Sequence, residues 1–403
     1  MQLNHSLQLA YCTNIHRGET WLETFASLQN YALAIREKVC PKKPFAIGLR
    51  LAERAAVELS DPGTRLAFQR WLGKNGCYVF TINGFPYGQF HGTRVKEQVY
   101  RPDWSAPERV AYTNLLFDLL AELLPAGIAG SVSTLPGSFK EFHPSAESQK
   151  AIRQNIWHTV EHIARISEKT GRKLHLGLEP EPLCLLENSA ETILFFEQLR
   201  DEHPRDPRLA EHLGVNYDCC HFAVEFEEPQ TALPRLVNHG IKISKIHLSS
   251  ALKVSPTPEA REALKKFSDD VYLHQVIARD ENGKRTTYRD LPEALASFKF
   301  QVSSVQPKRL ETEHLKLETS AEWRIHFHVP LHAPATPPFE NTSDHLLGTL
   351  DWLAENPQRC SHLEMETYTW EVLPPELKAQ SVVDQLAAEY GWTLAELAKR
   401  GLA

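Results

Sequence analysis

The sequence predicts an α/β fold, a (β/α)8 TIM barrel with a long insertion after the seventh strand. Apolar, β-branched runs alternate with helical patterns along the chain, which indicates a parallel sheet covered by helices. The alternation recurs about eight times, and this number favours a closed barrel over an open doubly wound sheet. No GxGxxG motif follows the first run. A length of 403 residues fits a barrel with insertions.

The candidate strands outnumber the eight positions of a barrel by one. Each is a short apolar run bounded by turn residues. In chain order the runs span residues 7–15, 45–51, 77–85, 127–135, 173–179, 213–218, 242–250, 323–331 and 362–370.

Helical patterns lie between these runs, and some have recognisable N-terminal caps. Asn188 precedes the pattern at 189–200, and Ser343 with Asp344 opens the pattern at 344–356. Further helical patterns cover 21–38, 107–124 and 145–171, and one or two short helices are expected at 381–401.

The regular alternation stops between about residues 253 and 322, where the patterns are mixed and polar. We therefore expect strands one to seven in residues 1–252, an insertion or lid over the barrel mouth in 253–322, and barrel completion with C-terminal helices in 323–403. The three segments would form one structural domain.

Bulk properties exclude several classes of protein. The formal charge of −7 gives no general attraction for nucleic acid. Seven cysteines without a CxxC pair favour free thiols over a disulfide framework. The N-terminus lacks the basic start and apolar run of a signal peptide, and residues 112–130, the most apolar stretch, carry Asp118 and Glu122. We expect a cytoplasmic protein without a membrane segment.

Acidic and histidine side chains stand at the ends of the later runs. Glu179 ends the fifth run, because Pro180 and Pro182 behind it remove ladder donors. Glu181 can share the same face, and Glu179 is the preferred ligand of the two. The other candidates are Asp218 and His221 after the sixth run, His247 on the seventh, His326 and His328 on the eighth, and Glu364 and Glu366 on the last.

Taken singly, such residues are usually salt-bridge partners, helix caps or satisfied core residues. Taken together they predict a divalent metal site, because the C-terminal ends of barrel strands converge on one point above the axis. Carboxylates with one or two imidazoles admit manganese, magnesium, cobalt or zinc. Either Glu364 or Glu366 can face this point.

A glycine-rich loop at residues 83–104 contains His91, Arg94 and Lys96. These side chains could bind an anionic group, a phosphate or carboxylate, of a small-molecule metabolite. An ordinary turn with solvated charges is the equally weighted alternative. Asn14, on the first run, is a further candidate for the pocket, although a core or capping role is the favoured interpretation.

Three stretches, YCTNIHRGE, NGFPYGQFHGTRVKEQVYRPDW and LEPEPLCLLEN, resemble the metabolite-traffic protein EboE family. The order of the elements is similar to that of the xylose-isomerase-like TIM barrels, which include sugar isomerases, ketose epimerases and an abasic-site endonuclease branch. The resemblance covers nearly the whole chain.

By this resemblance the epimerase metal ligands fall on Glu179, Asp218, His247 and Glu366. Glu179 and Glu366 would also act as the acid/base pair, and His221 would touch the substrate, with Glu181 beside it. His326 and His328 lie where the endonuclease branch has an Asp-x-His pair for additional metal, with histidine here in the aspartate position.

Three functions follow from these observations. The first is an isomerase or epimerase of a sugar-like carbonyl compound. The second is a non-catalytic metabolite-binding protein in a pathway of metabolite transport, which the EboE resemblance implies. The third is a metal-dependent phosphoesterase or endonuclease, which a second metal would favour and the acidic net charge opposes. Metal stoichiometry discriminates between them.

Overall fold

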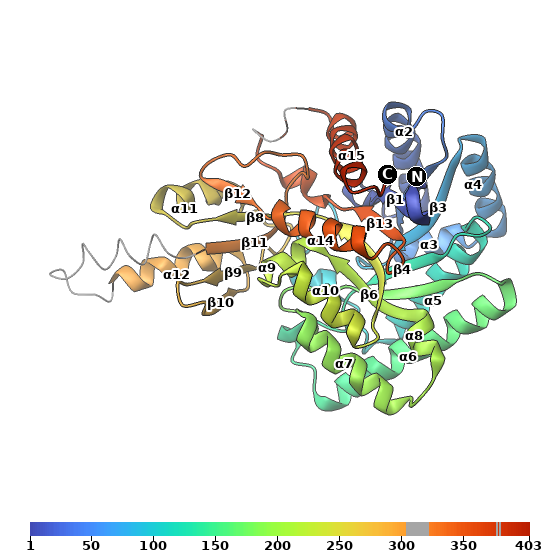
Figure 1. The fold of residues 1–403 in the computed structure, drawn as a ribbon, viewed down its shortest axis with the longest axis horizontal. Helices are drawn as coiled ribbons and strands as arrows, with labels where there is room; N and C mark the ends of the chain where they lie inside the picture. Colours follow the sequence, from blue (N-terminus) through green and yellow to red (C-terminus); the bar gives the residue numbers. More distant parts are fainter. Residues whose placement is uncertain (304–321, 376–377, 379) are drawn as a thin grey trace.

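Parallel pairing joins eight strands in the order β1, β13, β7, β6, β5, β4, β3, β2 (Figure 1). An isolated parallel bridge between Cys12 and Gly48 brings the first strand beside the second, so the sheet is a nearly closed (β/α)8 barrel, as predicted. The computed structural model describes residues 1–303, 322–375, 378 and 380–403. The barrel strands are β1 (Gln8–Tyr11), β2 (Phe45–Arg50), β3 (Cys77–Asn83), β4 (Gly130–Thr134), β5 (Leu174–Leu178), β6 (Leu213–Asp218), β7 (Lys242–Leu248) and β13 (His362–Met365).

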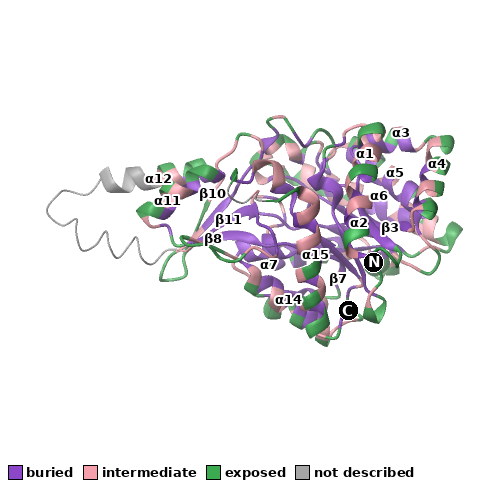
Figure 2. Cartoon of the chain, turned by 90° about the horizontal axis from the view of Figure 1, so that it is seen from above, coloured by how far each residue is buried: buried purple, intermediate pink, exposed green. Residues whose placement is uncertain are grey.

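Helices cover the outer face of the barrel, which leaves its strands buried on both sides (Figure 2). In the longest helix (Ala146–Thr170), the Ser145 hydroxyl caps the first turn and Gly171, with a φ of 68°, ends the last turn. Ile152, Ile156 and Val160 form the buried apolar stripe of this helix. The helices are α1 (Trp21–Ser27), α2 (Leu33–Val39), α3 (Glu53–Leu59), α4 (Pro62–Lys74), α5 (Pro107–Leu123), α6 (Ala146–Thr170), α7 (Ser189–Glu202), α8 (Pro207–His212), α9 (Cys219–Val224), α10 (Pro229–Asn238), α14 (Ser343–Glu355) and α15 (Val382–Lys399).

A second, antiparallel sheet projects from one side of the barrel between β7 and α14 (Figure 1). Its core is a separate apolar cluster that includes Leu252, Val276, Trp323 and Ile325. Its strands, in the order β10, β9, β11, β8, β12, and its helices are β8 (Ala251–Val254), α11 (Pro258–Leu264), β9 (Val276–Arg279), β10 (Arg285–Tyr288), α12 (Leu291–Ser303), β11 (Glu322–His328) and β12 (Phe339–Asn341). Short 3-10 or π segments are Asn4–Ser6, Thr13–Ile15, Leu28–Ala32, Lys96–Tyr100, Lys140–Phe142, Lys265–Phe267 and Tyr368–Val372.

The second sheet accounts for the surplus candidate strand. The run from Trp323 is β11, which pairs antiparallel with β8 and β9 and takes no place in the barrel. It resembles a barrel strand in sequence because it is buried from Trp323 to His328. The sheet spans Ala251 to Asn341, beyond both ends of the predicted 253–322 segment, of which residues 304–321 lie outside the described chain.

Two further expectations concern disulfide bonds and membrane-spanning helices. All seven cysteines are buried and free. Among the described residues, no helix is long and apolar enough to cross a membrane.

Candidate metal centre and pocket

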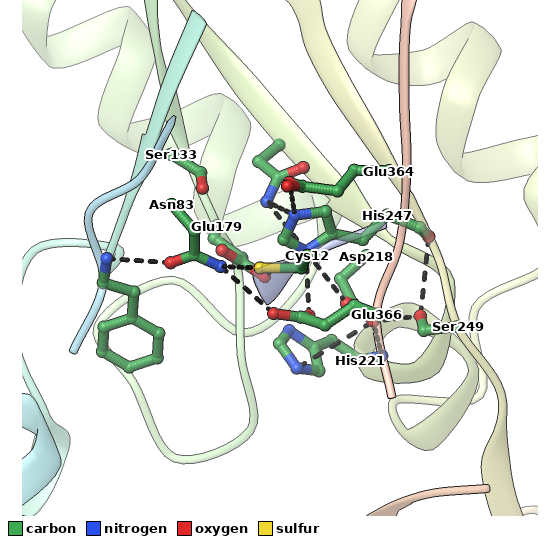
Figure 3. A network of polar contacts seen from close by, with 12 residues as sticks. Cys12, Asn83, Ser133, Glu179, Asp218, His221, His247, Ser249, Glu364 and Glu366 are labelled. Carbon is green, nitrogen blue, oxygen red and sulfur yellow. Dashed lines mark hydrogen bonds and ion pairs between the residues drawn. The ribbon is translucent and has the colours of Figure 1, made fainter. Parts of the chain in front are cut away.

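Four side chains from neighbouring strand ends meet at one point above the barrel axis (Figure 3). His247 Nδ1 lies 2.9 Å from Glu179 Oε1 and 2.9 Å from Glu366 Oε2, and 3.4 Å from Asp218 Oδ2. One ligand atom of each residue lies within 4.8 Å of the others, and all four are buried. This arrangement could hold a metal ion.

The local backbone structure places each of these four side chains in the group. Glu179 follows the last residue of β5, and its amide still donates to Thr134 O. Asp218 is the last residue of β6 and also the N-cap of α9, where its Oδ1 accepts from the His221 amide at 3.0 Å. His247 lies on β7, beside Asp218 in register. Glu366 directly follows β13.

The four residues fit a cation on electrostatic grounds. Burial opposes ionisation, yet His247 lowers the pKa of Glu179, and His221 and His247 hold the pKa of Asp218 well below its usual value. Burial likewise opposes the imidazolium of His247, but Glu366 and Glu179 raise its pKa well above 6.5. Three carboxylates around one imidazole are an excess of buried negative charge, which a divalent ion would offset. Glu179 Oε2 and Asp218 Oδ2 are buried without a hydrogen-bond partner in the described chain.

Polar neighbours hold the carboxylates in place. Glu366 Oε1 accepts from Asn14 Nδ2 at 2.7 Å and from Asn83 Nδ2 at 3.1 Å. The Ser249 hydroxyl donates to Asp218 Oδ1 at 2.7 Å. Such hydrogen bonds fix the orientation of metal-binding side chains. Asn14, a predicted pocket residue, therefore contacts the donor set through Glu366.

Glu364 lies behind His247, away from the other carboxylates. Its Oε2 is 2.9 Å from His247 Nε2 and accepts from Lys245 Nζ at 2.5 Å. Although burial opposes its ionisation, Lys245 and His247 lower the pKa of Glu364 to about 2. A side chain at Gly48 would occupy this space, because its Cβ would lie 1.9 Å from Glu364 Oε1. Of the two glutamates left open by the sequence, Glu366 borders the donor set.

Three histidines lie beside the donor set, with ring centroids 4.6 Å apart for His221 and His326 and 5.7 Å for His221 and His328. Each Nδ1 faces an oxygen that can only accept: Pro180 O at 2.9 Å for His221 and Glu366 O at 2.9 Å for His328. The Nδ1 of His326 lies 2.8 Å from Gln275 Oε1 in the same way. In the neutral imidazole, a proton on Nδ1 would leave a lone pair on Nε2.

The Nε2 atoms of His326 and His328 are buried without a partner in the described chain. Small groups that could hold a metal combine these histidines with Glu181, Asp218 or Cys220. The predicted pair from β11 therefore lies beside His221, although it belongs to the second sheet. Neither histidine of the pair is in the four-residue group, but His328 shares Asp218 with it.

Glu181 lies apart from Glu179, in a chain of hydrogen bonds. Tyr100 Oη donates to Glu181 Oε1 at 2.8 Å, and Gln275 Nε2 donates to Tyr100 Oη at 2.9 Å. Burial raises the pKa of Glu181 to about 8. Its Oε1 is 3.7 Å from His326 Nδ1.

A pocket opens onto Glu179, Glu366 and His221. Its outer part is formed by apolar and aromatic side chains of the loop after β3, of the segment before β9 and of the segment after β13. They include Phe85, Phe90, Val99, Tyr100, Tyr272 and Tyr368.

The predicted anion-binding residues take different positions. Lys96 lines the pocket, but its Nζ donates to Tyr272 O at 2.6 Å, Asp269 O at 2.8 Å and Asp290 Oδ2 at 2.7 Å. Arg94 is exposed and lines another hollow. His91 packs edge-on against Phe90 and is not among the described residues that line the pocket. Anion binding by these three residues stays a prediction that the contacts do not favour.

Sequence reasoning missed several contributors to the site. Asn83 ends the third strand, and this strand-end position could have marked it as a candidate site residue. Tyr100 ends a 3-10 segment after β3, and Tyr272 and Gln275 lie in the segment before β9, where no pattern marks a pocket residue. The roles of Lys245 and Glu364 depend on contact between two strands, which the sequence does not show.

Comparisons with known proteins show a similar backbone only. No family model matches the sequence, and no curated protein does. The probable 3-DHS dehydratase AsbF of Bacillus anthracis is 13% identical with a TM-score of 0.49, covering 96% of this chain and 99% of that one. An L-ribulose 3-epimerase is 10% identical with a TM-score of 0.48, covering 99% and 96%. The IOLI protein with a bound zinc atom is 13% identical with a TM-score of 0.34, covering 56% and 67%. These likenesses identify neither a substrate nor a reaction for this chain.

Proposed function

We propose that this protein is a metal-dependent isomerase or epimerase of a sugar-like carbonyl compound. The convergence of three buried carboxylates and the His247 imidazole at the inner end of a pocket supports this proposal. The proposed ligands are Glu179, Asp218, His247 and Glu366, and the ion would be manganese, magnesium, cobalt or zinc. When bound, it would polarise the substrate carbonyl and so make the proton on the adjacent carbon more acidic.

Glu179 and Glu366 are the proposed acid/base pair. Both line the pocket, and Glu179 Oε2 has no hydrogen-bond partner in the described chain. One carboxylate takes the proton from the carbon beside the carbonyl, and the electron pair of the broken C–H bond enters a C=C bond. Return of a proton to the other face gives the epimer, and return to the neighbouring carbon gives the isomer. The change is redox-neutral and needs no co-reactant.

His221 is the proposed substrate contact. Its Nδ1 lies against Pro180 O, so its Nε2 is the ring atom left for an oxygen of the substrate. Burial opposes its protonation, but Asp218 and Glu181 raise the pKa of His221. A protonated His221 would counter the negative charge that develops on the substrate oxygen.

Elemental analysis of protein purified without chelator tests the metal centre. We expect about one metal per chain in the wild type, as the four-ligand arrangement implies. The ion should be lost in Asp218→Asn and His247→Ala and kept in His239→Ala, a matched histidine variant outside the site. Metal retained in both site variants would contradict the proposal.

Hydrogen exchange tests the chemistry without knowledge of the product. Metal-loaded protein is incubated in D2O with pentoses, hexoses, hydroxyacetone and 2-hydroxyacetophenone, and deuterium on the carbon beside the carbonyl is measured by NMR. We expect incorporation that Glu179→Gln and Glu366→Gln abolish. Absence of exchange on every compound, with the metal content intact, would refute proton abstraction.

A phosphoesterase is the second candidate, and the three histidines favour it. The partnerless Nε2 atoms of His326 and His328 could help to hold a second ion. Two ions per chain, one of them lost in the double variant His326→Ala/His328→Ala, together with hydrolysis of bis(p-nitrophenyl) phosphate, would establish this function.

Membership of the EboE family and a role in metabolite transport are proposals that rest on the three sequence stretches quoted above. Under these proposals, the protein would be cytoplasmic and would bind a metabolite without converting it. Tight binding of a carbonyl metabolite with no hydrogen exchange and no hydrolysis would support that role.

A further inference from the structure

We infer that the substrate is an uncharged α-hydroxy carbonyl compound that carries an apolar group, and not a phosphorylated or carboxylated sugar. This inference rests on the proposed function, because the carboxylate cluster receives the hydroxy carbonyl end. It adds the chemical nature of the rest of the molecule, which the outer part of the pocket determines.

An aromatic wall, formed by Phe85, Phe90, Tyr100, Tyr272 and Tyr368, lines the pocket that also contains Glu179 and Glu366. The rings of Phe90, Tyr272 and Tyr368 contact one another, with centroids 5.0 to 5.5 Å apart. Phe85 packs on Tyr100 at 5.7 Å. Apolar surface of this kind gains free energy from covering an apolar ligand group and little from covering hydroxyl groups.

Apart from the proposed metal and His221, which the hydroxy carbonyl end would contact, the described lining of the pocket offers no available cation for an anionic group. Lys96 is the one lysine or arginine among its described lining residues, and its ammonium has three N–H donors. All three have acceptors: two backbone carbonyls and the Asp290 carboxylate. A phosphate would have to break this buried arrangement and would also face the carboxylates of Glu179 and Glu366.

Tyr272 Oη, in the aromatic wall, is buried without a hydrogen-bond partner in the described chain, so the wall also provides one polar atom to orient a ligand.

Three probes with the same α-hydroxy ketone end and different tails test the inference. They are hydroxyacetone with a methyl group, 2-hydroxyacetophenone with a phenyl group, and dihydroxyacetone phosphate. Calorimetry on the metal-loaded protein should give a Kd for the phenyl probe at least about tenfold below that of hydroxyacetone. The phosphate probe should bind no more tightly than hydroxyacetone. A phosphate probe that binds most tightly, or a phenyl probe equal to hydroxyacetone, overturns the inference.

Variants separate this inference from the proposed function. The ratio of the methyl to the phenyl Kd should fall towards one in Phe85→Ala and Val99→Ala, and should stay high in Leu66→Ala, which truncates an exposed apolar side chain outside the pocket. Asp218→Asn should weaken all three probes. Phenyl binding that survives in Asp218→Asn and is lost in Phe85→Ala would uphold the apolar pocket and refute the metal-bound end.

Discussion

Glu364 Oε2 lies 2.9 Å from His247 Nε2, on the side of the imidazole ring that faces away from the other carboxylates. The same oxygen accepts from Lys245 Nζ. A proton on Nε2 that is donated to Glu364 leaves Nδ1 as the atom that faces Glu179, Asp218 and Glu366. The buried Lys245–Glu364 pair therefore determines which ring nitrogen of His247 faces the proposed metal ligands.

Glu364→Gln is expected to destabilise the protein by about 3 kcal/mol or more, because it leaves the Lys245 ammonium buried without its counter-charge. Urea unfolding measures this loss. The double variant Lys245→Met/Glu364→Leu should recover part of it. Glu262→Gln, in an exposed pair with Lys265, should cost less than about 1 kcal/mol. Equal costs in the buried and the exposed pair would refute this explanation.

Gly48→Ala is expected to lower both stability and metal content, because the added Cβ would lie 1.9 Å from Glu364 Oε1 and 2.6 Å from Tyr11 O. The backbone contact leaves no room for a simple side-chain shift. Gly73→Ala, in α4 with no heavy atom within 4 Å of its Cβ, is the matched control and should be neutral or stabilising by about 0.5–1 kcal/mol. Thermal melting and elemental analysis give the two readouts.

Ser249→Ala is expected to reduce metal affinity about 10- to 100-fold, because Asp218 Oδ1 loses the hydroxyl that orients it. The neighbouring Ser250 provides a control, since its buried hydroxyl has no partner in the described chain. Ser250→Ala should leave the affinity unchanged. Competition with a chromogenic chelator measures both variants, and equal losses would show that Ser249 does not act through Asp218.

The buried carboxyl group of Glu389, on α15, should make the stability of the protein depend on pH. Burial raises its pKa from 4.5 to about 8, so the folded protein keeps a proton that the unfolded chain releases between these values. Stability is therefore expected to fall as the pH rises from about 4.5 to 8. Glu389→Gln removes this cost and should stabilise the protein at pH 8.5 by a few kcal/mol, at about 1.4 kcal/mol per pKa unit. At pH 4.5 the two proteins should melt at similar temperatures, and an equal gain at both pH values would contradict the assignment.

The barrel could be predicted from sequence because burial on both faces gives its strands continuous apolar runs. The same property made residues 323–331 indistinguishable from a barrel strand, since β11 is buried between its own apolar cluster and the barrel. Its assignment depends on antiparallel partners, β8 and β9, which are set by contacts distant in sequence.

The positions of the candidate donors could be predicted because strand ends converge, but their partners could not. Glu364 and Glu366 have the same alternation, and tertiary contacts distinguish them: Lys245 binds Glu364, whereas Asn14 and Asn83 bind Glu366. Lys96 lies in a loop that suggests anion binding, whereas its counter-charge, Asp290, is 194 residues away. Side-chain pairs of this kind are set by tertiary packing and leave no local pattern.

The second sheet leaves the barrel after β7 and returns before α14, while β7 and β13 pair directly with each other. Its stretch of chain brings Tyr272, Leu273 and His326 to the pocket, and the four proposed ligands remain on the barrel. Genetic recombination at these two points would exchange a pocket wall without disturbing any barrel hydrogen-bond ladder. Changes in that wall would thereby be uncoupled from changes in the barrel that carries the proposed ligands.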